Sequence, residues 1–350
     1  MPTAVVTGSG GLIGSQSVAR LCREGWHVVG IENDMRADFF GPEASTHAVS
    51  EALSRDFDDF REVELDIRDA EGVARVFREV PGGPDLVIHT AAQPSHDWAA
   101  REPFTDFGVN ATGSLNLLEA ARESCPDSPF VFCSTNKVYG DLPNFLPLEE
   151  RGTRLELPED HRYYDGIDTS MSIDRSTHSL FGVSKAAADL LVQEYGRYFG
   201  MPTVSFRGGC LTGPQHAGAE LHGFLSYLMK CVIEGRHYTV FGYGGKQVRD
   251  NIHCADMVDA FVAFAADPKS AAVYNIGGGR FSNCSMLEAI DACQRIAGRE
   301  LDWTLSDQNR IGDHRWWISD LSDFRRDYPG WRQRYGIEEI LQEIHASHAA

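Results

Sequence analysis

The feature that most limits what this chain can fold into is a glycine loop that follows a short apolar run. Residues 3–7 read TAVVT, a β-rich stretch. Glycines then recur at three-residue spacing, at Gly8, Gly11 and Gly14, within the start of a helical pattern that continues as SQSVARLCREG. The first glycine of such a loop allows a tight turn, the second lets backbone N–H groups approach a pyrophosphate, and the third lets helix and strand pack closely. The pattern therefore predicts a strand, turn and helix that bind a dinucleotide.

Strand-like and helix-like stretches continue to alternate beyond the loop. The runs HVVGIE, DLVIHTAA and PFVFCST are β-rich, and helical patterns such as AEGVARVFREV lie between them. This alternation is typical of an α/β fold, here a Rossmann-type doubly wound parallel sheet with helices on both faces. After about residue 207 turn-rich stretches separate shorter elements. We expect a dinucleotide-binding domain over residues 1–207 and a smaller C-terminal α/β lobe over residues 208–350 that binds substrate, with the chain crossing between them more than once.

Composition excludes several classes of partner. The formal net charge is −19 at pH 7, whereas binding to nucleic acid or to an anionic membrane needs a surplus of lysine and arginine. No apolar run approaches the roughly 18 residues of a membrane span, and the N-terminus lacks the pattern of a secretory signal. The eight cysteines contain no CxxC pair, so we expect reduced thiols in a cytoplasmic protein and no metal site.

The end of the second predicted strand supplies the contact to the adenosine ribose. Glu32 lies 18 positions after Gly14, and a carboxylate there accepts hydrogen bonds from ribose hydroxyls. The same charge would repel a 2′-phosphate, which favours NAD over NADP. Asn33 and Arg36 follow closely, and the positive charge of Arg36 weakens that preference slightly.

Further cofactor contacts are expected at the first helix and at two later strand ends. Because the helix N-terminus carries partial positive charge, Leu12 and Ile13 should lie beside the phosphates. At the strand ends, an acidic residue suits the adenine edge and small side chains let the dinucleotide lie against the backbone; these residues are Asp66, Ile67, Ala91, Ala92 and Gln93. Successive carboxyl ends of parallel strands outline one crevice.

Together these segments resemble the extended short-chain dehydrogenase/reductase family, specifically its NAD-dependent nucleotide-sugar epimerases and dehydratases. The resemblance covers essentially the whole chain and depends on the motifs TGSGGLIG, DIRD, HTAAQPS, VNATGSLNLLEAA, STNKVYGD, SLFGVSK, FGYGGKQVRDNIHCAD, YNIGGG and NRIGDHRWWISD. It implies NAD as the cofactor. It also implies a homodimer formed through a helical bundle that includes KAAADLLVQEYGRYF.

The family's catalytic group is a serine or threonine, a tyrosine and a lysine. By resemblance, Thr135 matches the first and Lys185 the last, which binds the nicotinamide ribose and lowers the tyrosine pKa. Asn110 matches an asparagine that supports the site. Phe181 occupies the tyrosine position, four residues before the lysine, and a phenyl ring has no proton to exchange.

Residues after Thr135 indicate which reaction of the family is retained. Sugar 4,6-dehydratases carry an acidic pair there, whereas this chain has Asn136 and Lys137, and an amide and an ammonium do not perform that carboxylate chemistry. Oxidation and reduction without loss of water are therefore favoured, which would give epimerisation. The STNKVYGD string resembles epimerases that act at C2 of a CDP-linked deoxyhexose. An NAD-dependent dehydratase or oxidoreductase acting on a nucleotide sugar or nucleoside is the alternative.

A nucleotide-sugar substrate carries a diphosphate that suits arginine forks. The resemblance places Arg249 and Arg310 at the substrate nucleotide, and Ser95, Asn136 and Lys137 at the sugar. His216 and His222 are further candidates for the sugar pocket, although a histidine is more often solvated or part of a core.

Three explanations of Phe181 remain open. It is an engineered replacement of a natural tyrosine, or a natural residue whose proton transfer another group performs, or a sign that the chain binds NAD and a nucleotide without turnover. Among candidate substitutes Tyr164 stands first. The others are Tyr163, Cys133, Thr135, His178, Cys210 and Lys185 itself.

Overall fold

The computed structural model describes residues 1–214, 223–308 and 312–349. Three predicted site residues, His216, His222 and Arg310, lie outside these described residues. The chain divides into two compact units. The first comprises Met1–Val138, Leu180–Arg207 and Val258–Tyr274, and the second comprises Tyr139–Ser179, Gly208–Met257 and Asn275–Ala350.

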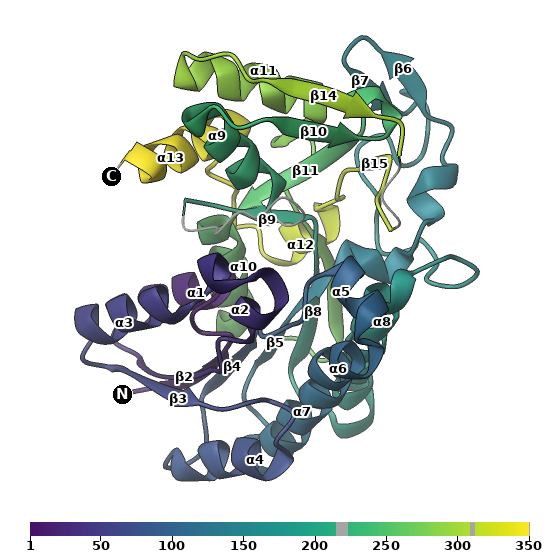
Figure 1. Cartoon of the computed structure of the whole chain (residues 1–350). Helices are drawn as coiled ribbons and strands as arrows, with labels where there is room; N and C mark the ends of the chain where they lie inside the picture. Colours follow the sequence, from purple (N-terminus) through teal and green to yellow (C-terminus); the bar gives the residue numbers. More distant parts are fainter. Residues whose placement is uncertain (215–222, 309–311, 350) are drawn as a thin grey trace. The chain divides into compact units, whose positions relative to one another are not determined.

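A seven-stranded sheet forms the first unit, in the order β12-β8-β5-β4-β1-β2-β3 (Figure 1). Its strands are β1 (Thr3–Thr7), β2 (His27–Glu32), β3 (Phe60–Glu64), β4 (Leu86–His89), β5 (Phe130–Thr135), β8 (Thr203–Gly208) and β12 (Ala272–Ile276). Neighbouring strands from β3 through β5 pair in parallel. The strand order reverses between β1 and β4, the position at which such sheets bind dinucleotides. The predicted Rossmann-type α/β fold is confirmed.

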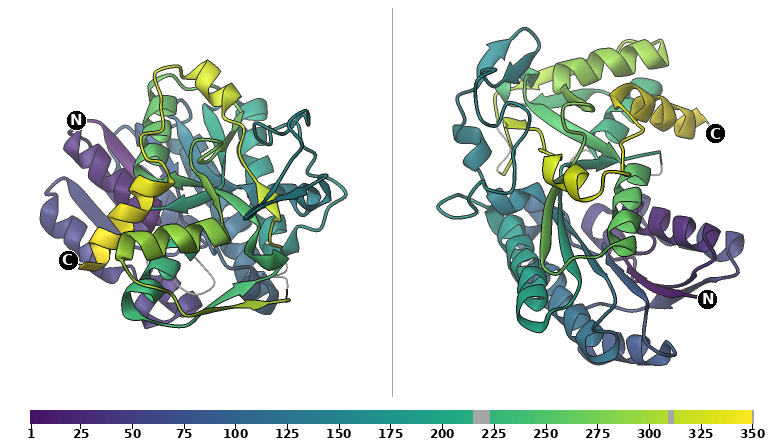
Figure 2. Two further views of the ribbon diagram at one scale, coloured as in Figure 1. Left: turned by 90° about the horizontal axis from the view of Figure 1, so that it is seen from above. Right: turned by 180° about the vertical axis from the view of Figure 1, so that it is seen from behind.

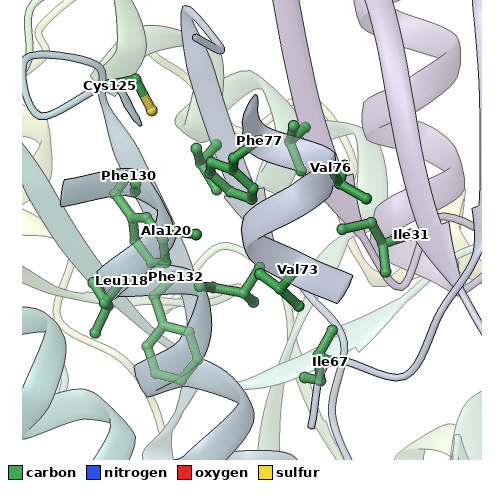
Figure 3. Close-up of a cluster of buried hydrophobic side chains, with 14 of the residues drawn as sticks. Ile31, Ile67, Val73, Val76, Phe77, Leu118, Ala120, Cys125, Phe130 and Phe132 are labelled. Carbon is green, nitrogen blue, oxygen red and sulfur yellow. The ribbon is translucent and has the colours of Figure 1, made fainter. Parts of the chain in front are cut away.

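Helices cover both faces of this sheet. They are α1 (Leu12–Arg23), α2 (Met35–Phe40), α3 (His47–Asp56), α4 (Ala70–Glu79), α5 (His96–Arg101), α6 (Pro103–Phe107), α7 (Gly113–Ser124), α8 (Ser179–Phe199) and α10 (Cys254–Ala266). On one face α4 and α7 pack side by side, and Figure 3 shows Val73, Val76 and Phe77 of α4 in one apolar cluster with Phe130 and Phe132 of β5. These side chains are almost fully buried, so this face supplies much of the apolar burial that stabilises the unit.

The second unit is built around β11. That strand pairs with β13 in antiparallel register and with β15 and β9 in parallel register. The strands of this unit are β6 (Glu149–Arg151), β7 (Arg154–Glu156), β9 (Cys210–Thr212), β10 (Tyr238–Phe241), β11 (Val248–His253), β13 (Asn283–Ser285), β14 (Trp303–Ser306) and β15 (Trp316–Trp317). Its helices are α9 (Phe224–Glu234), α11 (Met286–Ala297), α12 (Ser322–Asp327) and α13 (Ile337–Ala349). Helices α9, α11 and α13 share one apolar cluster, and Figure 2 shows the yellow α13 beside the lime-green α11 in both views.

The unit boundaries differ from a single division after residue 207 in two segments. Residues 139–179 contain β6 and β7 and belong to the second unit, although they precede residue 207. The Leu155 N–H donates to the carbonyl of Lys246, and Ile167 bridges to Ser319, which attaches this segment there. Conversely, Val258–Tyr274 belongs to the first unit, where Phe261 and Phe264 of α10 pack against Phe206 of β8. No helix among the described residues combines the length and apolarity that crossing a bilayer would require.

A buried carboxylate in β11 joins three segments of the second unit. Asp250 is fully buried, and its Oδ2 accepts hydrogen bonds from the backbone N–H of Ser319 (2.9 Å) and of Gly279 (3.0 Å). A Cβ added at Gly277 would lie 2.1 Å from that oxygen, so a glycine is needed beside it. Burial raises the pKa of Asp250 to about 6, against the opposing effect of those hydrogen bonds.

This raised pKa predicts a specific pH dependence of stability. The unfolded carboxyl titrates near 3.9, so between about pH 4 and pH 6 the folded state holds more protons, and stability falls as pH rises. We expect Asp250→Asn to remove this fall, which amounts to about 3 kcal/mol for a shift of roughly two units. Urea unfolding of both proteins from pH 4.5 to 7.5 measures this effect. The other titrating groups cancel when the unfolding free energy of the variant is subtracted from that of the wild type. If the plots of unfolding free energy against pH stay parallel for the two proteins over this range, the prediction is wrong.

Candidate functional site

The glycine loop between β1 and α1 has the conformation that the sequence predicts. Gly8 adopts a φ of +67°, and a Cβ added there would lie 2.8 Å from the backbone nitrogen of Ala91, at the end of β4. A Cβ added at Gly14 would lie 1.9 Å from the carbonyl oxygen of Gly8. Gly11 precedes α1 and provides no side-chain cap, which leaves the first N–H groups of the helix, at Leu12 and Ile13, available to an anion.

The predicted adenosine end is assembled at the ends of β2 and β3. Oε2 of Glu32 accepts a hydrogen bond from the Gly10 N–H (3.0 Å), and its Oε1 accepts one from the Asn33 N–H (2.9 Å). Burial raises the pKa of Glu32 despite these bonds. Burial also lowers the pKa of Arg36, against the opposing charge of Glu32, so the two side chains are electrostatically coupled.

Asp66 and Ile67 lie at the same end of the sheet. Burial alone would raise the pKa of Asp66, but hydrogen bonds from Arg68 and from the Asn33 side chain outweigh it and hold that pKa below its usual value. Ile67 is buried, and its carbonyl accepts a hydrogen bond from Nδ2 of Asn116 (2.9 Å). The structure therefore brings the predicted adenosine contacts together, and their donors and acceptors fit a nucleoside.

A buried hydrogen-bond network connects the loop after β4 to the start of α8. Oδ1 of Asn110 accepts from the Gln93 N–H (3.0 Å), while its Nδ2 donates to Oδ1 of Asp106 and to Oγ of Ser184, both at 3.0 Å. Ser184 in turn donates to the carbonyl oxygen of Phe181 (3.0 Å). Asn110 lies in a π-helical turn, Gly108–Thr112, and such turns are frequent at functional sites. Asn110 therefore joins the loop after β4 to the start of α8, and its supporting role in the site stays a prediction.

Lys185 is buried beside the end of β5. Its Nζ donates to the carbonyl oxygen of Cys133 (3.0 Å) and lies 4.3 Å from the ring centre of Phe132. Burial lowers the pKa of Lys185 to about 8, although the nearby Asp189 and Asp106 oppose the shift. At neutral pH the side chain therefore remains mostly a cation.

Thr135 and the two residues after it form the turn at the end of β5. Oγ1 of Thr135 accepts a hydrogen bond from the Lys137 N–H (3.2 Å). This bond caps the turn at the end of β5. Asn136 is buried, and its Oδ1 lies 3.5 Å from Oγ1 of Thr135. Burial raises the pKa of the Cys133 thiol to about 11, so at neutral pH the thiol stays protonated and is not available to accept a proton.

Phe181 lies on the first turn of α8, one helical turn before Lys185 and on the same face. Only 6% of its surface is exposed. Its ring meets the imidazole of His96 edge to face, with ring centres 4.8 Å apart. His96 could not be found from the sequence, because its contact with Phe181 joins residues far apart in the chain and QPSHDW matches no catalytic motif.

The remaining predicted residues divide between the two units. Ser95 lies in the first unit and caps α5 by accepting the Trp98 N–H (3.1 Å). Tyr164 lies in the second unit, where its ring lies under the Arg280 guanidinium at 4.1 Å. Arg249 is also in the second unit, and its guanidinium pairs with Asp313 at 3.1 Å.

The other candidate substitutes for the tyrosine, Tyr163, His178 and Cys210, belong to the second unit as well. Tyr163 is buried with the Arg162 guanidinium over its ring. His178 lies within 3.3 Å of the Ser176 hydroxyl, and Cys210 begins β9. None of these contacts assigns any of the three a role in proton transfer.

Comparisons with known proteins agree with this arrangement. The sequence profile of the NAD dependent epimerase/dehydratase family matches residues 4–277. CDP-paratose 2-epimerase of Salmonella typhi is 29% identical over 350 residues, covering 97% of each chain. dTDP-glucose 4,6-dehydratase 1 of Escherichia coli is 30% identical over 355 residues, covering 97% of this chain and 90% of the relative. The crystal structure of UDP-glucose 4-epimerase from Thermus thermophilus, a complex with NAD, superimposes with a TM-score of 0.79 at 26% identity and 99% coverage of both chains.

Proposed function

Because this chain belongs to the NAD-dependent epimerase/dehydratase family, we propose that it is an epimerase of a nucleotide-linked sugar, acting at C2 of a CDP-deoxyhexose. The observation that carries the proposal is the pair Asn136 and Lys137, which stands after Thr135 where a dehydratase needs two carboxylates. The similarity to CDP-paratose 2-epimerase supports the choice of nucleotide and carbon. NAD is the cofactor, as the family description states.

The chain's own residues account for binding and orientation. The glycine loop and the α1 N-terminus hold the pyrophosphate, and Glu32 with Asp66 holds the adenosine. Bound NAD supplies an acceptor for hydrogen leaving the sugar carbon and a donor for its return. Lys185 holds a positive charge beside the nicotinamide ribose, and Thr135 donates to the reacting sugar oxygen. Arg249 binds the diphosphate.

The test combines binding with product analysis. Purified protein is screened by thermal shift against CDP-, UDP-, GDP-, dTDP- and ADP-sugars, and the product of each stabilising sugar is identified by NMR and mass. We expect a CDP-sugar to bind and to give a C2 epimer of unchanged mass. Loss of one water would instead identify a dehydratase, and a net change in NAD redox state would identify an oxidoreductase. If no nucleotide sugar binds, the proposal fails.

A nucleotide-binding protein without turnover is the second candidate, and Phe181 is the observation that favours it. Such a protein would bind NAD and the sugar nucleotide yet leave the sugar unchanged. Transient NADH absorbance after addition of a bound sugar separates the two, because it requires hydride transfer.

The proposed assembly is a homodimer formed through α7 and α8. Large apolar side chains are exposed along these helices and the adjoining α6; they are Phe104, Phe107, Leu115, Leu180, Val183, Leu190, Tyr198 and Phe199. Exposed apolar patches of this kind mark protein interfaces. We expect Leu190→Asp to convert a dimer to a monomer in analytical ultracentrifugation at micromolar concentration. Leu305→Asp, at an exposed leucine of β14, is the matched control and should leave the mass unchanged. Equal masses for both variants would contradict this interface.

A further inference from the structure

The first unit places an imidazole against the residue that lacks the catalytic phenol. His96 begins α5, directly after the loop that follows β4, and its ring centre lies 4.8 Å from that of Phe181 at an interplanar angle of 64°. His96 is partly exposed, whereas Phe181 is buried. The phenyl ring therefore packs against the imidazole, and the imidazole is the more exposed of the two.

One hydrogen-bond network joins the backbone segments that carry the two rings. Nε2 of Gln93 donates to the carbonyl oxygen of Ser95 (2.9 Å) and to Oδ1 of Asp106 (2.7 Å), which anchors the residues directly before His96. The same Asp106 accepts from Asn110, which bonds Ser184, whose hydroxyl donates to the Phe181 carbonyl. The loop and the helix are therefore held in register without a direct bond between the two rings.

The N-terminal turn of α5, which carries His96, is held in place as well. Ser95 caps the helix through the Trp98 N–H, and the Trp98 ring packs on Phe39 with centres 4.5 Å apart. A side chain that exchanges protons with a substrate needs such support, because a small displacement of the side chain lowers the catalytic rate.

Other bases of the first unit are less suited to accept a proton. Burial raises the Cys133 thiol pKa to about 11, and Lys185, with a pKa of about 8, is mostly an ammonium at neutral pH. The Asp106 carboxylate is buried and accepts hydrogen bonds from Gln93 and Asn110. Imidazole has an ordinary pKa near 6.5 and is the side chain most often used for general acid–base catalysis.

We propose that His96 is the catalytic base that replaces the missing phenol, an inference that rests on the proposed epimerase function. The sugar O–H bond breaks and its proton moves to the unprotonated imidazole nitrogen. The carbon's hydrogen leaves with both bonding electrons to the bound oxidised dinucleotide, and the carbon–oxygen bond becomes a carbonyl. On return, hydrogen and electrons re-enter from the opposite face, and the imidazolium gives its proton back to the oxygen. No proton or electron is gained or lost overall.

The test uses His96→Gln, Phe181→Tyr and the double variant in the full-length protein with bound NAD. We expect His96→Gln to lower kcat by about 10²–10⁴-fold, the usual contribution of a general base, with unchanged NAD content and CDP-sugar affinity. Adding Phe181→Tyr to His96→Gln should raise kcat at least tenfold above that of His96→Gln alone, because it returns a phenol beside Lys185. A purely structural role of His96 would not be rescued in this way. His47→Gln, at an exposed histidine of α3, is the matched control.

A second readout does not depend on turnover. In protein labelled with ¹³C-histidine, the His96 ring signal, assigned by its loss in His96→Gln, should shift when CDP-glucose is added, while that of His47 should not. The proposal is overturned by a kcat for His96→Gln within threefold of wild type, by absence of rescue, by a His96 signal that CDP-glucose leaves unmoved, or by a wild type that binds the sugar without turnover. A wild type that binds no nucleotide sugar overturns the epimerase function itself, and with it this proposal. An active wild type with an equally active His96→Gln overturns only the role of His96.

Discussion

Replacement of Lys185 by methionine is expected to lower kcat by about 10²–10³-fold, the typical cost of removing one preorganised charged donor from an active site. Methionine retains most of the apolar stem but removes the ammonium that lies 3.0 Å from the Cys133 carbonyl. That carbonyl loses its donor, and the positive charge beside the bound ribose disappears. Because the ammonium sits in a buried position, no solvent cation substitutes for it easily.

The measurement is kcat and KM for the sugar that the binding screen identifies, together with NAD content after purification. Lys269→Met, in the segment between α10 and β12, controls for loss of a lysine charge and should keep wild-type kinetics. If Lys185→Met keeps kcat within threefold of wild type, the lysine has no part in the chemistry, and the resemblance to the family's catalytic group fails at this position.

Local sequence patterns predicted the first half of the sheet well. The glycine loop follows β1, Glu32 is the last residue of β2 and the small residues follow β4, so their place at a strand end can be read directly from the β-rich runs. Their convergence follows from parallel strands having carboxyl ends at one edge. The structure agrees, since Gly8 leaves no room for a side chain beside Ala91.

Long-range pairing could not be predicted in the same way. Strand β12 joins the sheet next to β8, although β9, α9, β10 and β11 of the second unit lie between the two in sequence. The segment 139–179 shows few periodic apolar residues, and β6 and β7 within it are only three residues each. These two strands pair with each other, and the hydrogen bond from the Leu155 N–H of β7 to the carbonyl of Lys246 is a distant contact that a local pattern does not contain.

Site residues that belong to a sequence motif could be predicted. A residue that is near the site only in the folded structure could not. Thr135, Lys185 and Asn110 follow from motifs, and in the structure the lysine and the asparagine are buried. The sequence offers substitutes for the phenol only in the segment before Phe181 and at other recognisable motifs, with Tyr164 first. The structure instead shows His96 at the Phe181 ring, a contact between the first turns of α5 and α8, which lie far apart in the sequence. Tyr164 remains a prediction, and its role is separable from that of His96 by Tyr164→Phe.

The largest effect on cofactor binding is expected from Gly14→Ala, which adds a single methyl group. The added carbon would lie 1.9 Å from the Gly8 carbonyl oxygen and 2.7 Å from its carbonyl carbon, far inside contact distance. Both neighbours are backbone, so the strain cannot be relieved by a side-chain rotation, and the α1 N-terminus must move away from β1. We expect loss of stoichiometric NAD in the purified protein and destabilisation of about 1–3 kcal/mol, the range for overpacking a tight core.

Absorbance of released cofactor and urea unfolding measure these two effects. Gly330→Ala is the matched control, because a methyl group added there meets no atom within 4 Å. It should retain NAD and wild-type stability. A Gly14→Ala protein that keeps full NAD would mean that the loop does not hold the pyrophosphate. Cofactor binding, and with it the proposed chemistry, therefore depends on the close approach of α1 to the turn after β1. The presence of the helix and the strand alone is not sufficient.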